Sequence, residues 1–255
     1  MAANLPELRI VPLPDLPEVR PGHDLAALLM EAAGRAVGGG LADGDILVVT
    51  HKVVAKAEGC VVDLRTVQPS PFARVYAERW GKDARQVEVV LRESARIVRM
   101  DRGVMICETR HGFVCANAGV DRSNAGAEET VVTLPPDPDA SARRLREALI
   151  GGSGRRLAVV ISDTFGRPWR EGLTNVAIGC SGLRPLRDER GQVDAQGYRL
   201  EVSVLAVADE LASAAELAMG KLGGVPAALI RGYEYEDGEG SARELVRAPE
   251  KDIFR

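Results

Sequence analysis

Three uninterrupted apolar runs constrain the fold more than any other feature of this sequence. They are ILVV (46–49), AVVI (158–161) and the run inside VPAALIRG (225–232). A strand that is apolar at every position, and not only at alternate positions, must have both of its faces covered. Since such strands are typical of proteins in which helices pack against a sheet, the runs predict buried strands within an α/β fold.

Helix signals lie between these runs. PGHD (21–24) starts a helix that stops at residues 38–40, and SP (70–71) starts another that ends near Trp80. Further helices are predicted over 84–94, from Asp139 to the glycines at 151–152, and over 206–221. Residues 96–121 instead resemble a β meander with turns at 101–103 and 111–112. Because the meander interrupts the alternation of strands and helices, we predict a mixed α/β sheet. Residues 1–255 are expected to form a single domain, which could consist of two subdomains.

The charge and cysteine content narrow the class of protein. The 33 basic and 37 acidic side chains give a net charge of −4, without the basic stripe that nucleic-acid-binding proteins show. The N-terminus lacks a signal-peptide pattern, and no apolar run approaches the ~18 residues of a membrane span. The four cysteines form no C-x-x-C pair and are expected to be reduced. We therefore expect a cytoplasmic enzyme that binds neither nucleic acid nor a membrane.

Several common catalytic motifs are missing. The sequence has no G-x-x-x-x-G-K-[ST] phosphate loop, no G-x-G-x-x-G after its first strand, no G-x-S-x-G elbow and no H-E-x-x-H. If the chain binds a nucleotide, it must therefore do so by another route.

The stretch ISDTFGRPWREG (161–172) carries the strongest chemical signal. The buried strand is predicted to end at Asp163, and Thr164 places a hydroxyl beside that carboxylate. Oxygen ligands of this kind suit Mg²⁺ or Mn²⁺. Arg167 and Arg170 follow, and each could neutralise phosphate or carboxylate oxygens. The alternative is a strand end followed by a solvated basic turn.

A second stretch, HGFVCANAGVDRSN (111–124), also ends in an acid. Asp121 precedes the amide of Asn124 by three residues, and the two strand-end aspartates could share one metal if their strands are neighbours. The alternative is a local turn capped by the Asp121 and Asn124 side chains.

Two further segments carry charged side chains that could bind phosphate or a metal ion. Lys52 and Lys56 lie four residues apart after a buried strand, where they could bind phosphate or form a solvated basic face. In VADELASAAELAMGK (207–221), Glu210 could face a metal from the start of a helix. More commonly, such acids only stabilise a helix N-terminus.

Taken together and in this order, THKVVAKAEG, ETRHGFVCANAGVDRSN, ISDTFGRPWREG and ADELASAAELAMGK resemble the coenzyme F420-0:L-glutamate ligases. VPLPDLPEVRPG, near the N-terminus, also fits, so the resemblance covers about residues 8–254. It implies an intertwined homodimer with the F420 ligase-like fold. It also implies an enzyme that uses GTP and Mg²⁺ or Mn²⁺, with K⁺ as a further candidate ion. Such an enzyme joins L-glutamate to coenzyme F420-0 and adds further glutamates by γ-linkage.

The resemblance also assigns residues. Asp121 and Asp163 match ligands of a first metal, and Thr164 matches a ligand of a second. His51 stands where the family often has a serine that touches GTP, which bears on nucleotide preference. The expected nucleotide contacts are Leu13, Pro14, Asp15, Leu16, His51, Lys56, Asn124 and, by proximity only, Glu210. From charge and position we add Arg167 and Arg170 to Asp163 as expected catalytic residues.

A poor leaving group limits direct amide formation from a carboxylate, so we expect the substrate carboxylate to be phosphorylated first. The competing hypotheses are a metal-dependent phosphohydrolase, another nucleotide-dependent amide ligase and a non-enzymatic nucleotide-binding protein. EKDIFR (250–255) resembles the junction at which some relatives continue into a nitroreductase-like domain, and we expect no such domain in this chain.

Overall fold

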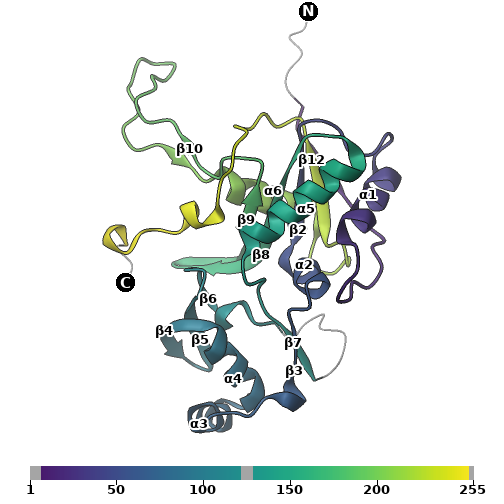
Figure 1. Cartoon of the computed structure of the whole chain (residues 1–255). Coiled ribbons are helices and arrows are strands. Elements are labelled where there is room, and N and C mark those ends of the chain that lie inside the picture. Colours follow the sequence, from purple (N-terminus) through teal and green to yellow (C-terminus); the bar gives the residue numbers. More distant parts are fainter. Residues whose placement is uncertain (1–6, 122–128, 253–255) are drawn as a thin grey trace, which may run out of the picture.

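A five-stranded mixed sheet forms the centre of the molecule (Figure 1). The computed structural model describes residues 7–121 and 129–252. The strand order is β1-β12-β2-β8-β9, in which β2 and β8 are parallel and the other neighbours are antiparallel. This confirms the predicted mixed α/β class. The strands are β1 (Arg9–Pro12), β2 (Asp45–Thr50), β8 (Leu157–Arg167), β9 (Arg170–Ser181) and β12 (Ala227–Arg231).

Helices cover both faces of this sheet, as the uninterrupted apolar runs require. Leu47 and Val49 of β2 belong to the hydrophobic core that includes α1 and α5. Ile46 and Val48 belong to the core on the opposite face, which includes α6. Each apolar residue of β2 therefore packs against helices on one face or the other, because successive side chains of a strand point to opposite faces. The helices are α1 (Leu25–Ala36), α5 (Pro138–Ser153) and α6 (Val207–Met219).

The predicted helix starts are confirmed. Asp24 caps α1 by accepting a hydrogen bond from the Ala27 amide at 3.0 Å, and Ser70 caps α3 (Pro71–Trp80). Helix α4 (Ala84–Glu93) follows, while the short helix α2 (His51–Ala57) was not predicted. The predicted stop of α5 at residues 151–152 was wrong. The helix continues to a left-handed Gly154, because a glycine inside a helix costs only about 1 kcal/mol.

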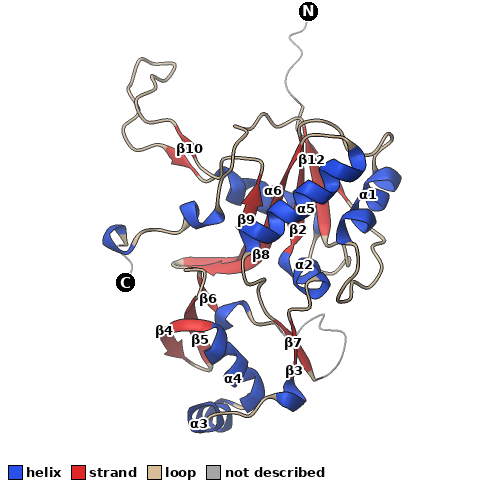
Figure 2. Cartoon of the chain, in the orientation of Figure 1, coloured by secondary structure: helices blue, strands red, loops and turns tan. Residues whose placement is uncertain are grey.

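A second part of the chain packs around its own core (Figure 2). Strands β3 (Val61–Asp63) and β7 (Thr130–Val132) pair where the chain enters and leaves this part. Between them lie α3, α4 and the meander β4 (Ser94–Asp101), β5 (Val104–Thr109) and β6 (Val114–Ala116). The core here is separate from the two cores of the large sheet. The division into two subdomains stays a prediction.

The meander ends earlier than predicted. Strand β6 stops at Ala116, and the short 3₁₀ turn η2 (Asn117–Gly119) follows with φ of 52°, 51° and 71°. A Cβ on Gly119 would lie 2.8 Å from the Leu134 side chain, so this turn requires glycine. Asp121 therefore does not end a strand. It forms an isolated bridge with Val132 instead.

Strand β8 is longer than predicted, and the prediction that it ends at Asp163 was wrong. Its parallel neighbour β2 ends where Thr50 pairs with Ser162. Beyond that point β8 continues to Arg167, paired with β9 alone in a long hairpin. Asp163 is thus the first residue of β8 beyond the parallel pair. The strand continues because β9 still satisfies its backbone hydrogen bonds on one side.

The remaining elements are short, and the cysteines are reduced as predicted. Cys107 and Cys115 lie opposite one another in the meander, and both are free thiols. Burial raises the pKa of the Cys115 thiol to about 12, so it stays protonated at neutral pH. The short elements are β10 (Arg187–Asp188), β11 (Val204–Leu205), η1 (Leu64–Thr66), η3 (Ala242–Leu245) and η4 (Pro249–Lys251).

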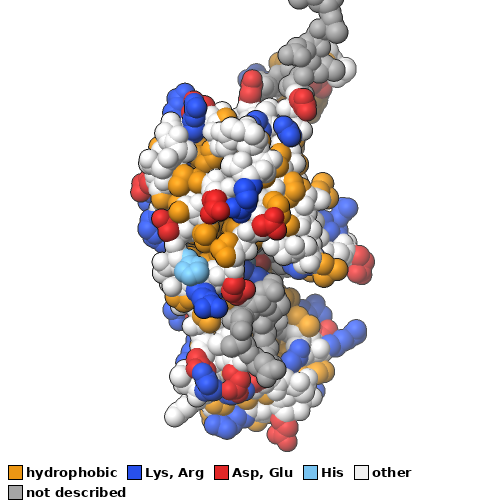
Figure 3. All heavy atoms as spheres, turned by 90° about the vertical axis from the view of Figure 1, so that its right-hand side faces the viewer, with side chains coloured by type: hydrophobic (Ala, Val, Ile, Leu, Met, Phe, Trp, Pro, Cys, Tyr) orange, Lys and Arg blue, Asp and Glu red, His pale blue; other side chains and the backbone are white. Residues whose placement is uncertain are grey.

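The described surface gives two further observations. On the face shown in Figure 3, basic side chains are interspersed with acidic ones. Over residues 7–121 and 129–252, no helix has both the length and the apolar character needed to cross a membrane.

Candidate functional site

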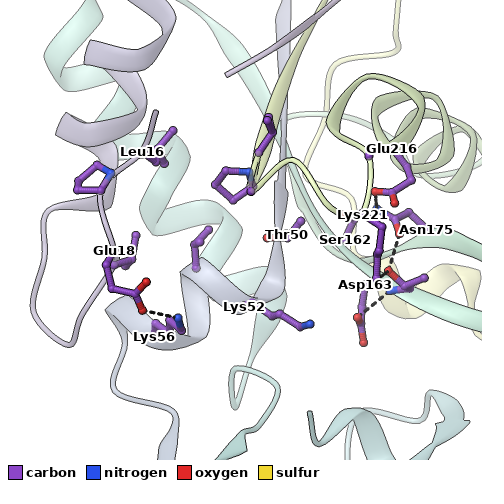
Figure 4. A pocket seen from close by; sticks show the side chains of 18 residues that line it. Leu16, Glu18, Thr50, Lys52, Lys56, Ser162, Asp163, Asn175, Glu216 and Lys221 are labelled. Carbon is purple, nitrogen blue, oxygen red and sulfur yellow. Dashed lines mark hydrogen bonds and ion pairs between the residues drawn. The ribbon is translucent and has the colours of Figure 1, made fainter. Parts of the chain in front are cut away.

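A polar cavity of about 250 Å³ lies beside the end of β2 and the middle of β8. In Figure 4 the side chains of Glu18 and Lys56 stand on one side of it, and those of Asp163, Glu216 and Lys221 stand on the other. Five segments of the sequence build its walls. The lining residues are 16–19, 50, 52, 53, 56, 162–164, 175, 216, 220, 221 and 224–226.

Asp163 lines the cavity, and its carboxylate is held from two directions. Its Oδ1 accepts a hydrogen bond from the Thr164 amide at 2.7 Å and lies 3.2 Å from His51 Nε2. His51 is the first residue of α2 and is only 2% exposed. It does not line the cavity, so it supports Asp163 from behind. Sequence reasoning placed this imidazole on the nucleotide and missed its contact with the carboxylate.

Asp121 reaches the same region from another segment. Its carboxylate forms an ion pair with Lys52 Nζ. Lys52 follows His51 directly, so the two aspartates contact consecutive residues at the start of α2. Two acids that are 42 positions apart in the sequence thus both contact the start of α2.

These two carboxylates fit a single divalent ion. In the described part of the chain, no three His, Cys, Asp or Glu side chains form a cluster that could hold a metal alone. Mg²⁺ is commonly bound by one or two carboxylates and completed by phosphate oxygens and water. Asp163, which lines the cavity, and Asp121, the ion-pair partner of the lining residue Lys52, would offer donors of that kind.

Thr164 does not fit the second metal that the resemblance assigned to it. Its hydroxyl donates to Asn175 Oδ1 at 2.8 Å and accepts from Lys221 Nζ at 3.0 Å. An ammonium group therefore lies where the second cation would bind. Asn175 in turn donates to Glu216 Oε2 at 3.0 Å, so the wall of the cavity is a connected polar chain.

Lys56 lies opposite this chain. It is 8% exposed, and its Nζ forms an ion pair with Glu18 Oε1 at 2.8 Å. The hydrogen bond from Lys56 lowers the pKa of the Glu18 carboxyl. Of the predicted N-terminal contacts, Leu16 lines the cavity, whereas Leu13 is fully buried in the core. Pro14 and the left-handed Asp15, with φ of 60°, lie between them.

Other predicted residues lie elsewhere. Arg167 and Arg170 flank the turn of the β8–β9 hairpin, and Arg167 donates to the Glu171 carbonyl at 3.0 Å. Glu210 is exposed on α6 and does not line the cavity. Asn124 lies outside the described residues.

Sequence reasoning also missed three residues of the cavity wall: Asn175, Glu216 and Lys221. Glu216 lies two turns of α6 beyond Asp209. Asn175 is a polar residue at the start of an apolar segment, and the structure shows that it is only 2% exposed.

A larger cavity of about 710 Å³ is also lined by residues of the β8–β9 pair. Aromatic and aliphatic side chains form most of its wall, among them Phe113, Phe165 and Trp169. Val176, the register partner of Asp163, also lines it. The two cavities therefore share one strand pair.

Comparison with known proteins adds independent evidence. The sequence model of the F420-0:Gamma-glutamyl ligase family matches residues 15–232. The chain is 50% identical to the coenzyme F420:L-glutamate ligase of Methanopyrus kandleri over 257 residues, which cover 99% of each chain. It is 45% identical to that of Methanothermobacter thermautotrophicus, over 97% of this chain and 99% of the relative. For the Archaeoglobus fulgidus enzyme of the same name the identity is 41%, over 97% and 96%. With the match extending over both the sheet and the polar cavity, the chain belongs to the F420-0:gamma-glutamyl ligase family.

Proposed function

We propose that the protein ligates L-glutamate to coenzyme F420-0, adds further γ-linked glutamates, and uses GTP to activate the carboxylate. Membership of the family supports the acceptor and the amino acid. The observation that carries the nucleotide part is the polar cavity. There, Asp163 and the lysines 52, 56 and 221 converge from separate segments. Carboxylates and lysines around one cavity are suited to a metal-bound triphosphate.

The chemistry explains why a nucleotide is needed. A carboxylate oxygen of F420-0 attacks the γ-phosphorus of GTP, the β–γ bridging bond breaks, and GDP leaves. The resulting acyl phosphate is attacked at carbon by the amine of glutamate. The carbon–oxygen bond to phosphate then breaks, so an amide and inorganic phosphate are formed, and the ammonium group of glutamate gives up two protons and keeps one as the amide N–H. Phosphate is a far better leaving group than oxide, which removes the main barrier to amide formation.

The side chains of the cavity have separate tasks in this scheme. Lys56 and Lys221 supply positive charge to the phosphate oxygens, since an ammonium group is a common phosphate ligand. Asp121 and Asp163 would hold one divalent ion, which stabilises charge on the β- and γ-phosphates when bound. The paired strands β8 and β9 keep Asp163 in place, because reaction rates fall steeply when reacting groups are displaced. Arg167 and Arg170 stay proposed contacts for the anionic parts of the substrates.

Replacement of Asp163 tests the proposal. Asp163→Asn keeps the side-chain size but removes the charge, so ligation should fall at least about 100-fold, the scale of losing one electrostatic stabiliser. Mass spectrometry of F420-0 incubated with GTP, glutamate and Mn²⁺ measures the product. Glu147→Gln, on the exposed side of α5, is the matched control and should keep full activity. Full activity of Asp163→Asn would remove the assigned role of this carboxylate.

Measuring the release of phosphate from GTP distinguishes a ligase from a phosphohydrolase. A ligase should release phosphate from GTP only when both F420-0 and glutamate are present. Release of phosphate in the absence of either substrate, without amide product, would favour the hydrolase.

A further inference from the structure

The lysine at position 221 occupies an unexpected place in the polar cavity. It follows Gly220 at the end of α6, and its Nζ lies 3.0 Å from Thr164 Oγ1. The Thr164 hydroxyl hydrogen is directed to Asn175 Oδ1, so a lone pair of the same oxygen accepts from the lysine. The Thr164 hydroxyl therefore both donates a hydrogen bond to, and accepts one from, side chains of the protein itself.

Acidic side chains line the same cavity as this ammonium group. Glu216 and Asp163 line the same cavity as Lys221. Glu216 is also fixed in place, because Asn175 Nδ2 donates to its Oε2 at 3.0 Å. The resulting chain of contacts runs from Glu216 through Asn175 and Thr164 to Lys221. The positive charge of Lys221 thus shares the cavity wall with two carboxylates.

A divalent ion on Thr164 would conflict with this arrangement. Lysine has three donors and no acceptor, so its ammonium group cannot serve as a metal ligand while protonated. Two cations on one hydroxyl oxygen would also repel each other. The wall of the cavity thus places a monovalent cation on Thr164, where a second metal was expected.

We propose that Lys221 takes the place of the second divalent ion, so that each active site binds one divalent ion and not two. This inference rests on the proposed function, because it concerns the charge that faces the triphosphate. One ion would be held by Asp121 and Asp163, and the ammonium group of Lys221 would face the phosphate oxygens from the side of Thr164.

Counting bound metal tests the inference without measuring turnover. The full chain is titrated with Mn²⁺ in the presence of the non-hydrolysable β,γ-imido analogue of GTP, and free Mn²⁺ is measured by electron paramagnetic resonance. We expect one Mn²⁺ per chain for the natural sequence. Two per chain would overturn the inference.

Two variants of Lys221 and one control variant test the expected number of bound ions further. Lys221→Glu places a carboxylate beside Thr164 and should raise the count from one to two, whereas Lys251→Glu, an exposed lysine of η4, should leave it at one. Lys221→Met removes the charge without adding a ligand. It should keep one Mn²⁺ and weaken binding of the analogue about 10-fold, since one charged contact is lost. If Lys221→Glu still binds one ion, or if Lys221→Met binds the analogue as tightly as the natural chain, the inference is wrong.

The outcomes separate this inference from the proposed function. One Mn²⁺ per chain, rising to two in Lys221→Glu, supports the role of Lys221 even if no glutamate is ligated. Ligation of glutamate by a chain that binds two Mn²⁺ supports the proposed function and contradicts the role of Lys221.

Discussion

At the scale of single residues, the contact between His51 and Asp163 is the least expected feature of the site. The imidazole Nε2 lies 3.2 Å from the carboxylate, and the ring is almost fully buried. Since α2 begins directly after Thr50, the first side chain of this helix is directed at the neighbouring strand β8. The residue thus fixes the orientation of a carboxylate and does not need to touch the nucleotide itself.

Substitution of His51 should separate positioning from packing. His51→Ala loses a hydrogen bond to a charged group, worth about 1.5–3 kcal/mol, so the turnover number should fall roughly 10- to 100-fold. His51→Gln keeps a donor and should retain most of the activity. The measurement is kcat at saturating Mn²⁺ together with the Mn²⁺ concentration giving half-maximal rate. Equal losses in both variants would show that only the shape of the imidazole matters.

The sequence allowed some of these residues to be found and not others. Asp163 and Asp121 could be predicted because each follows an apolar segment, where an acid is unusual. Lys221 and Asn175 could not, because their significance is a contact with Thr164 between elements distant in the sequence. His51 was found through the resemblance, but its direction depends on an unpredicted helix.

At the scale of elements, the packing of α5 on β9 depends on a glycine. A Cβ on Gly179 would overlap the carbonyl group of Pro138, at the first turn of α5. The backbone of β9 therefore approaches the helix start closely. Asp139 reinforces this contact, since its Oδ1 accepts a hydrogen bond from the Cys180 amide at 2.9 Å.

We expect Gly179→Ala to lower the free energy of unfolding by about 1–3 kcal/mol, the cost of an overpacked core. Gly151→Ala is the matched control, because a Cβ there meets nothing within 4 Å inside the same helix. It should raise stability by about 0.5–1 kcal/mol, since alanine favours a helix more than glycine does. Urea unfolding followed by circular dichroism measures both. An unchanged midpoint for Gly179→Ala would contradict the close approach.

The contact between α6 and β9 should depend on pH. Burial raises the pKa of the Asp209 carboxyl above its ordinary value of 3.8, although the Ala177 amide donates to it at 2.8 Å. Its charged form is therefore unfavourable in the folded protein. This cost is absent below pH 3.8 and is complete once the pH has risen through the raised pKa.

Asp209→Asn should consequently increase the free energy of unfolding at pH 7, because an amide oxygen can still accept from Ala177 without a buried charge. The increase should shrink as the pH is lowered towards 3.8. Urea unfolding of both proteins at pH 7, 5 and 4 checks this. A gain that is the same at every pH would mean that charge is not its cause.

At the scale of the whole molecule, the β8–β9 hairpin extends beyond the sheet and carries exposed apolar side chains. Trp169 is 80% exposed and Leu173 is 65% exposed. Exposed apolar groups on a projecting element are typical of an interface between protein chains. We therefore expect the predicted homodimer to form through this hairpin.

Light scattering coupled to size exclusion should give about twice the 27.3 kDa mass of one chain. Leu173→Glu should shift the mass towards that of a monomer, because it places a charge in the interface. Leu217→Glu, which alters an 88% exposed leucine on α6, should not. A dimer that persists in Leu173→Glu would place the interface elsewhere.

The overall architecture was predictable where the local sequence pattern is strong. The apolar runs of β2, β8 and β12 predicted three buried strands of an α/β fold, and the cap at Ser70 predicted α3. The continuation of β8 to Arg167 was not predictable, because its residues beyond Ser162 are polar or mixed and depend on pairing with β9. Pairing with a second strand stabilises this part of β8, and the local sequence pattern does not reveal that pairing.

The strand pair shared by the two cavities has a consequence for inhibitor design. Asp163 borders the small polar cavity, and Val176, its neighbour across the pair at a Cα distance of about 5 Å, borders the large apolar one. Since residues directly opposite each other in an antiparallel pair point to the same face, an anionic fragment and an aromatic fragment in the two cavities would bind at neighbouring positions of one hairpin. Joining them by a short tether along the hairpin would turn two weak ligands into one bivalent compound, whose second binding event is intramolecular.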